Sequence, residues 1–106
     1  MNKKQKILND LKILLNKNFS DQIAKIILYG SQIDHNHKKN SDYDILIILK
    51  KQYDWKLKNR IYDLLYEIDL KHDIVTDIKI ISLEELETIR GKLPYIQNAL
   101  QYGIQL

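Results

Sequence analysis

Two short apolar runs separated by a long polar stretch constrain this chain more than any other feature of its sequence. Residues Ile23–Tyr29 are apolar almost without alternation, which is typical of a strand buried on both faces. A second apolar run covers Ile45–Leu49, and polar, turn-prone residues fill Gly30–Asp44 between the two. The pattern predicts two strands of one sheet, joined by a polar loop that leaves the first strand at Gly30.

Hydrophobic periodicity and capping residues predict the remaining elements. Asp54 is a suitable cap for a helix, and Ser82 with Glu85 has the spacing of a capping box. A third strand is expected where Val, Ile and Thr concentrate. The expected elements are helices over Lys4–Lys17, from Asp54 to Ile68, over Leu83–Arg90 and over Pro94–Tyr102, the second strand over Asp42–Leu49, and the third over Ile74–Ile81.

This order of elements predicts one domain over residues 1–106 with an α/β (α+β) fold. We expect a small mixed sheet of three to four strands with helices on one face. The opposite face would then be open, and it would carry the acidic beginning of the second strand.

Composition narrows the function classes. The chain has no cysteine, which excludes disulfides and thiolate metal sites, and no apolar run approaches the roughly 20 residues that span a bilayer. Its net charge of +3, from 17 basic and 14 acidic residues, is dispersed. A solvated lysine surface is therefore favoured over a nucleic-acid interface. We expect a cytoplasmic protein without membrane contact.

The two ends of the polar loop carry the residues with the clearest chemical potential. Asp42 and Asp44 stand two residues apart in the second strand, so their side chains point to the same face. Such neighbouring carboxylates repel each other unless a cation lies between them, and a divalent ion with oxygen ligands meets that need. At the other end, Gly30 and Ser31 allow the backbone to approach an anion closely. The loop is therefore suited to metal-assisted chemistry on a nucleoside triphosphate.

This arrangement resembles the signature of the DNA polymerase beta-like nucleotidyltransferases. The matching pattern is Gly-Ser, ten residues, then Asp-x-Asp between two apolar strands, and the chain's length resembles the minimal nucleotidyltransferases of the HEPN/MNT antitoxin type. Gly30, Ser31, Ser41, Asp42 and Asp44 match the family pattern. The loop departs from it at 32–35, where the family often has arginines and a glycine, and lysines at 38 and 39 offer replacement charge.

The resemblance implies transfer of a nucleoside monophosphate, AMP from ATP, to a hydroxyl, with two Mg²⁺ ions. Asp42 and Asp44 would bind the metals together with a third carboxylate from a neighbouring strand. Asp77 is preferred for that role, and Asp73 is the alternative because sequence does not fix strand register. The implied nucleotide-binding residues are Gly30, Ser31, Lys38 and Ser41.

The resemblance also implies a partner, a helical HEPN-domain toxin whose hydroxyl would accept the AMP. A homo-oligomer is the alternative assembly. A second hypothesis is a non-catalytic antitoxin or nucleotide-binding subunit that acts by binding its helical partner. A third is a regulatory subunit acting on RNA or an antibiotic.

Two other groups of residues are not expected to belong to the site. His35, His37 and His72 lack the companion ligands of a zinc site, although imidazoles at positions i and i+2 could bind zinc. The aromatic residues Tyr53, Trp55, Tyr62 and Tyr66 are expected to pack in the core or contact a partner rather than stack on bases.

Overall fold

The computed structural model describes residues 2–30 and 43–106. Four of the predicted nucleotide- or metal-binding residues, Ser31, Lys38, Ser41 and Asp42, lie outside the described residues, as do His35 and His37.

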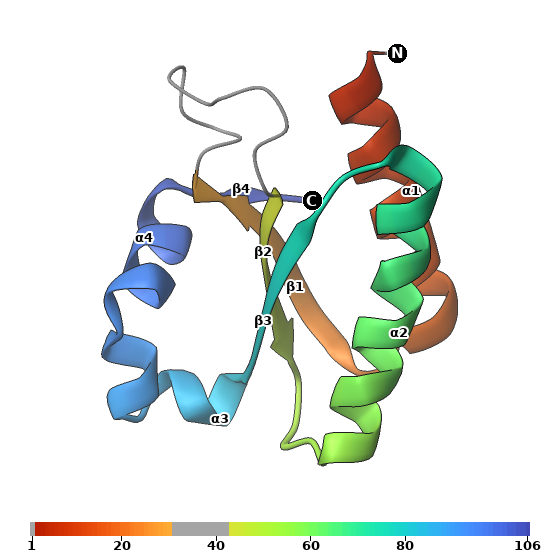
Figure 1. Cartoon of the computed structure of the whole chain (residues 1–106). Helices are drawn as coiled ribbons and strands as arrows, with labels where there is room; N and C mark the ends of the chain where they lie inside the picture. Colours follow the sequence, from red (N-terminus) through yellow and green to blue (C-terminus); the bar gives the residue numbers. More distant parts are fainter. Residues whose placement is uncertain (1, 31–42) are drawn as a thin grey trace.

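A four-stranded mixed sheet forms the centre of the molecule (Figure 1), which confirms the expected architecture. The strands lie in the order β3-β2-β1-β4. β2 runs parallel to β3, because helix α2 carries the chain back across the sheet, and β1 is antiparallel to both of its neighbours. The strand bounds are β1 Ile23–Tyr29, β2 Tyr43–Leu49, β3 Thr76–Ser82 and β4 Ile104–Gln105.

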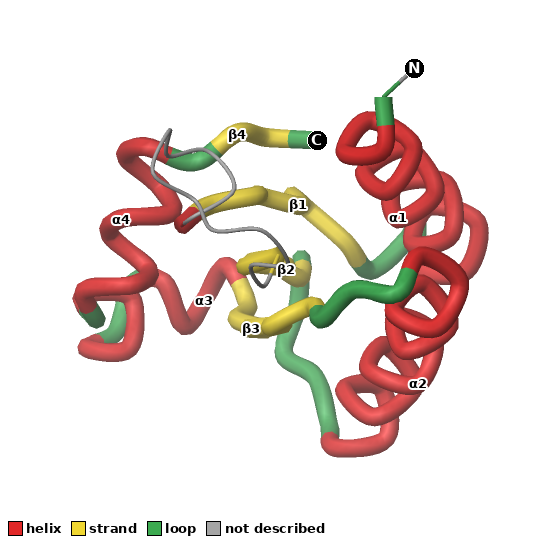
Figure 2. The backbone as a smooth tube through the Cα atoms, turned by 45° about the horizontal axis from the view of Figure 1, so that its top comes forward, coloured by secondary structure: helices red, strands yellow, loops and turns green. Residues whose placement is uncertain are grey.

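Helices cover both faces of this sheet (Figure 2), so the expectation of helices on one face alone is wrong. Helices α1 and α2 pack on the first face and enclose the larger core. On the second face, α4 buries Ile96 and Ala99 against apolar residues of β1, β2 and β3. The helix bounds are α1 Lys3–Phe19, α2 Trp55–His72, α3 Leu83–Leu86, the 3₁₀ turn η2 Ile89–Lys92, and α4 Pro94–Tyr102.

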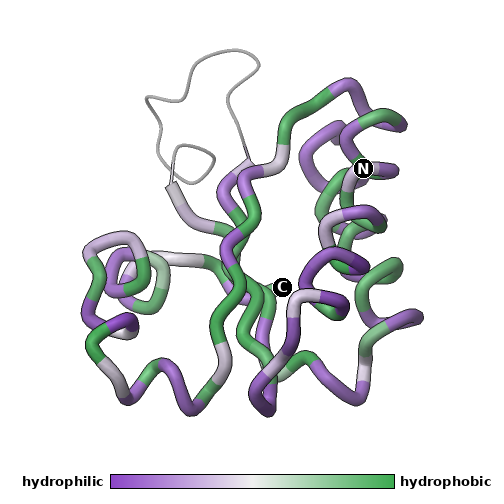
Figure 3. Tube along the Cα trace, turned by 60° about the horizontal axis from the view of Figure 1, so that its bottom comes forward, coloured by the Kyte–Doolittle hydropathy of each residue, from purple (hydrophilic) through white to green (hydrophobic). Residues whose placement is uncertain are grey.

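Strands β1 and β2, in the middle of the sheet, are mostly apolar (Figure 3), as expected for strands with a core on each side. Residues 45–49 of β2 are all at most 1% exposed. The acidic start of β2 is therefore held at the end of a rigid, buried strand.

Local capping explains where several helices begin and end. Asn2 and Gln5 form a capping box at the start of α1, and the Asp54 carboxylate accepts the Leu57 N–H at 2.9 Å. The predicted Ser82–Glu85 capping box is present at α3. That helix ends at Leu86 rather than at Arg90, because Thr88 caps a separate 3₁₀ turn by accepting the Arg90 N–H.

Candidate functional site

Asp44 and Asp77 lie side by side at one end of the sheet. Each is the second residue of its strand, and the parallel register of β2 and β3 pairs the two directly. Neighbouring strands are about 4.8 Å apart, so the side chains emerge close together. Both project to the sheet face that carries α4, on which Leu46 and Ile81 from the same strands are buried.

Tyr29 extends this pair into a row across three strands. The antiparallel register of β1 and β2 places Tyr29 opposite Asp44. The tyrosine is only 6% exposed, and its burial raises the pKa of its hydroxyl well above the usual value. The nearby Asp44 and Asp77 carboxylates and Tyr95 raise that pKa further, so Tyr29 stays a neutral phenol at physiological pH.

Gly30 follows β1, at a position where the neighbouring Asp44 carboxylate leaves little space for a side chain. Its φ is +75°, a region that residues with a side chain rarely adopt. A Cβ atom at this position would lie 2.2 Å from the Asp44 Oδ2 atom. A side chain at this position would therefore adopt an unfavourable backbone conformation and would also displace the Asp44 carboxylate.

The structure separates Asp77 from its alternative, Asp73. Strand β3 begins at Thr76 rather than at Ile74, and Asp73 is the C-cap of α2, in a left-handed conformation with φ of 54°. Its backbone N–H donates to the Asp69 carbonyl. Asp73 therefore lies outside β3, whereas Asp77 lies within it.

Two residues beside the row were not predicted as site residues, Lys79 and Tyr95. The Lys79 Nζ lies 3.4 Å from Asp77 Oδ1 and 5.8 Å from the centre of the Tyr95 ring on α4. Strand alternation already places Lys79 on the same face as Asp77, which is the signal that could have found it. Tyr95 has no such signal, because its position depends on how α4 packs.

A groove of about 400 Å³ lies between α2 and the outer edge of β3. Asp77 and Lys79 line it together with residues of α2, including Tyr66, which is 60% exposed. On the same edge, the Tyr53 and Tyr62 hydroxyls donate to the Ile80 and Ile78 carbonyls at 3.1 and 3.4 Å. These two tyrosines have structural roles, as expected.

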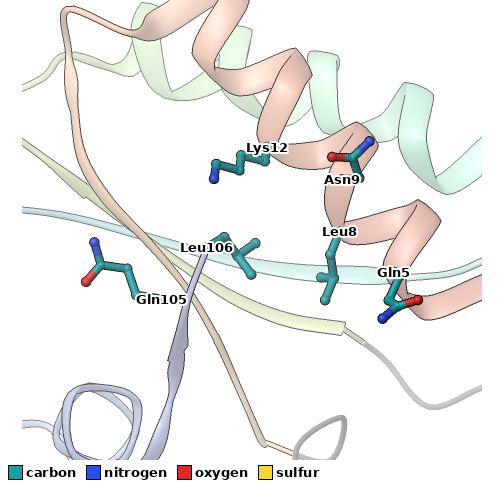
Figure 4. Close-up of a pocket in the computed structure, with 6 residues that line it drawn as sticks. All are labelled: Gln5, Leu8, Asn9, Lys12, Gln105 and Leu106. Atoms are coloured by element: carbon teal, nitrogen blue, oxygen red, sulfur yellow. The ribbon is translucent and has the colours of Figure 1, made fainter. Parts of the chain in front are cut away.

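A larger hollow of about 600 Å³ lies between α1 and the end of the chain (Figure 4). Its lining consists of three amides, two leucines and a lysine: Gln5, Asn9, Gln105, Leu8, Leu106 and Lys12. None of these six side chains is a carboxylate, which distinguishes the hollow from the groove that Asp77 lines.

The metal ligands within the described residues are fewer than a complete site needs. Over residues 2–30 and 43–106, no group of three histidine, cysteine or acidic side chains is arranged to bind a metal. Asp44 and Asp77 supply oxygen donors from adjacent strands, the donor type that Mg²⁺ prefers, and Asp42 lies outside the described residues. His72 instead contacts Asp10 of α1, with 2.8 Å between its Nε2 and the Asp10 Oδ2.

Within the same ranges, none of the helices combines the length and the hydrophobicity needed to cross a membrane.

Known proteins share this sequence pattern and fold. Two proteins of Methanocaldococcus jannaschii, "Putative protein adenylyltransferase MJ0141" and "Putative protein adenylyltransferase MJ0604", are 26% and 28% identical to the chain over 100 and 99 residues. The alignments cover 94% and 93% of this chain and 95% and 93% of those proteins.

Solved structures of toxin–antitoxin complexes have the same fold. The MntA-HepT complex matches with a TM-score of 0.59 and 22% identity, over 95% of this chain and 69% of that one. A complex of tri-AMPylated Shewanella oneidensis HEPN toxin with MNT antitoxin matches with a TM-score of 0.58 and 21% identity, over 95% and 69%. The family described as "Polymerase beta, Nucleotidyltransferase" matches residues 9–99, and the chain therefore belongs to this nucleotidyltransferase family.

Proposed function

We propose that this chain is a magnesium-dependent protein adenylyltransferase that moves AMP from ATP to a hydroxyl of a helical HEPN-type partner, and so acts as an antitoxin. The observation that carries the proposal is the register of Asp44 with Asp77 beside the turn at Gly30. The names of the two M. jannaschii relatives support the reaction. The structure of an AMPylated HEPN toxin with an MNT antitoxin supports the partner.

The roles of the carboxylates follow from their places in the sheet. Asp42, Asp44 and Asp77 would hold two Mg²⁺ ions, which supply charge neutralisation on the phosphates and on the attacking and leaving oxygens. Asp77, at the edge strand, accepts the proton of the acceptor hydroxyl. The hydroxyl oxygen forms a bond to the α-phosphorus, the bond from that phosphorus to the bridging oxygen breaks, and pyrophosphate leaves.

The polyphosphate would lie near the end of β1. Gly30 brings the backbone next to Asp44 without a side chain in the way, which favours close approach of an anionic group that shares a cation with that carboxylate. Ser31, Ser41 and Lys38 are the proposed contacts to the phosphates, by hydrogen bonds from the hydroxyls and by the charge of the lysine.

The strand order supports a proposal for the side from which the acceptor comes. In an in-line displacement, the attacking and leaving oxygens stand on opposite sides of the phosphorus. With the leaving pyrophosphate toward β1 and the carboxylates on β2 and β3, the attacking hydroxyl approaches from the β3 edge. The groove lined by Asp77 lies at that edge and is the proposed entry for the acceptor residue.

Transfer of label from α-³²P-labelled ATP tests the reaction. The chain is incubated with Mg²⁺ and candidate acceptors, beginning with a helical HEPN-type protein if an adjoining reading frame encodes one. We expect label on that protein, and a loss of at least about 100-fold with Asp44→Ala or Asp77→Asn. Asp73→Asn is the matched control and should keep the wild-type rate, because asparagine also tolerates the left-handed cap.

The loop sequence favours a second candidate function, a binding-only antitoxin. The loop has Gln32, Asp34 and His35 where the family often has arginines and a glycine. The double variant Asp42→Asn/Asp44→Asn separates the two candidates. Neutralisation of the toxin by this variant at the wild-type level would exclude AMP transfer as the mechanism, whereas loss of neutralisation with retained complex formation supports it.

A further inference from the structure

Lys79 is held against Asp77 by two independent contacts. Its Nζ lies 3.4 Å from the Asp77 Oδ1, and the ring of Tyr95, on a different element, lies under the same ammonium group at 5.8 Å. The side chains of Lys79 and Asp77 are 42% and 45% exposed. Both line the groove between α2 and β3. The ammonium group thus lies on the same face of the sheet as the carboxylates.

The negative charges around this contact explain why a positive group stabilises the arrangement. Asp44 and Asp77 stand in register on adjacent strands, and Tyr29 closes the row from the other side as a neutral phenol. Like charges at this spacing repel each other, and a positive group near one of them reduces the repulsion. Lys79 supplies that positive charge from the protein itself.

We propose that Lys79 is a positioning residue that holds Asp77 in the metal-free protein and competes with the divalent cation for its carboxylate. The inference rests on the proposed function in one respect, that Asp77 is a metal ligand. A cation that binds between Asp44 and Asp77 meets the repulsion of the ammonium group until Lys79 moves away from Asp77. Lys79 therefore weakens metal binding in the absence of nucleotide.

Mn²⁺ binding without nucleotide tests the proposal, measured by titration calorimetry and by loss of the electron paramagnetic resonance signal of free Mn²⁺. Lys79→Gln should lower the Kd by about 5-fold, the size expected for removal of one partly exposed charge pair. Lys79→Arg keeps the charge and should restore the wild-type value. The control is Lys58→Gln, which removes the same charge and a ring contact of 5.9 Å to Tyr62, and it should leave the Kd unchanged.

The outcomes separate this inference from the proposed function. Equal Mn²⁺ affinity in wild type and Lys79→Gln, with weaker binding in Asp77→Asn, would overturn the role of Lys79 and leave the metal site intact. An equal gain in affinity in Lys58→Gln would also overturn it, because the effect would then be one of net charge. Absence of Mn²⁺ binding to both the wild-type chain and Lys79→Gln at millimolar concentration would overturn this inference alone, because the proposed reaction takes place with ATP bound. Circular dichroism of each variant establishes that it is folded.

Discussion

At the scale of single residues, the structure disfavours any side chain at Gly30. A side chain there faces two separate penalties, a φ of +75° and a contact of 2.2 Å with the Asp44 carboxylate. We expect Gly30→Ala to lower the free energy of unfolding by about 1–3 kcal/mol, in the range of backbone strain at such positions. Urea denaturation followed by circular dichroism measures the change.

A double variant separates the two penalties. In Gly30→Ala/Asp44→Ala the carboxylate that the new Cβ would strike is absent, so part of the lost stability should return. Strictly additive losses would contradict the contact and leave only the backbone conformation as the cause.

At the scale of elements, a charged cluster joins α1 to the end of α2. The Asp10 Oδ2 lies 2.9 Å from Lys71 Nζ and 2.8 Å from His72 Nε2. The hydrogen bonds to Lys71 and His72 lower the pKa of Asp10 from its ordinary value of 3.8. Because the pKa is lower in the folded state, the contribution to stability is complete above that ordinary value and is lost as the pH falls through the folded one.

Asp10→Asn should therefore flatten the acid side of the pH–stability curve between about pH 5 and pH 2. Unfolding free energies measured by urea titration at several pH values check this. Lys71→Gln removes one of the two partners and should flatten the curve partly. An unchanged slope in Asp10→Asn would show that the cluster is broken in solution.

The outer edge of β3 depends on two tyrosine hydroxyls from the α2 region. Tyr53 donates to the Ile80 carbonyl at 3.1 Å, and Tyr62 donates to the Ile78 carbonyl at 3.4 Å. Tyr53→Phe should cost about 1 kcal/mol of stability, because the partly buried carbonyl loses its partner, and Tyr62→Phe should cost less. Thermal and urea denaturation give the values. A larger loss in Tyr62→Phe would contradict this ranking.

For the whole molecule, the sequence predicts where most elements lie, but it does not predict arrangements that depend on how the elements pack together. The bounds of β1 and α4 follow from apolar runs ended by glycine, and the α3 capping box follows from the spacing of Ser82 and Glu85. The sheet face that α4 covers cannot be predicted from the sequence, because a helix of nine residues could pack on either face. The alternation of side chains along a strand likewise does not predict that Asp73 is a left-handed helix cap.

The candidate site also has a part that the sequence predicts and a part that only the packing determines. Alternation along β3 places Asp77 and Lys79 on one face, but their neighbours Tyr29 and Asp44 come from the pairing of three strands. The side chain of Tyr95 reaches the row only because α4 returns over the second face. The sequence alone thus predicts which residues of one strand share a face, whereas the row across three strands depends on how those strands pair.

The whole fold should respond to nucleotide, because a ligand that binds only the folded chain stabilises it by mass action. At 100 times its Kd, Mg-ATP should add about 2.7 kcal/mol, which raises the Tm of a domain of this size by about 10 °C or more. Differential scanning fluorimetry measures the shift, with ATP in excess EDTA as the control that removes the metal. Asp44→Asn should lose most of the shift, because Asp44 lies between the end of β1 and Asp77. An equal shift in wild type and Asp44→Asn would place nucleotide binding elsewhere, since no other described acidic residue shares both of these neighbours in the sheet.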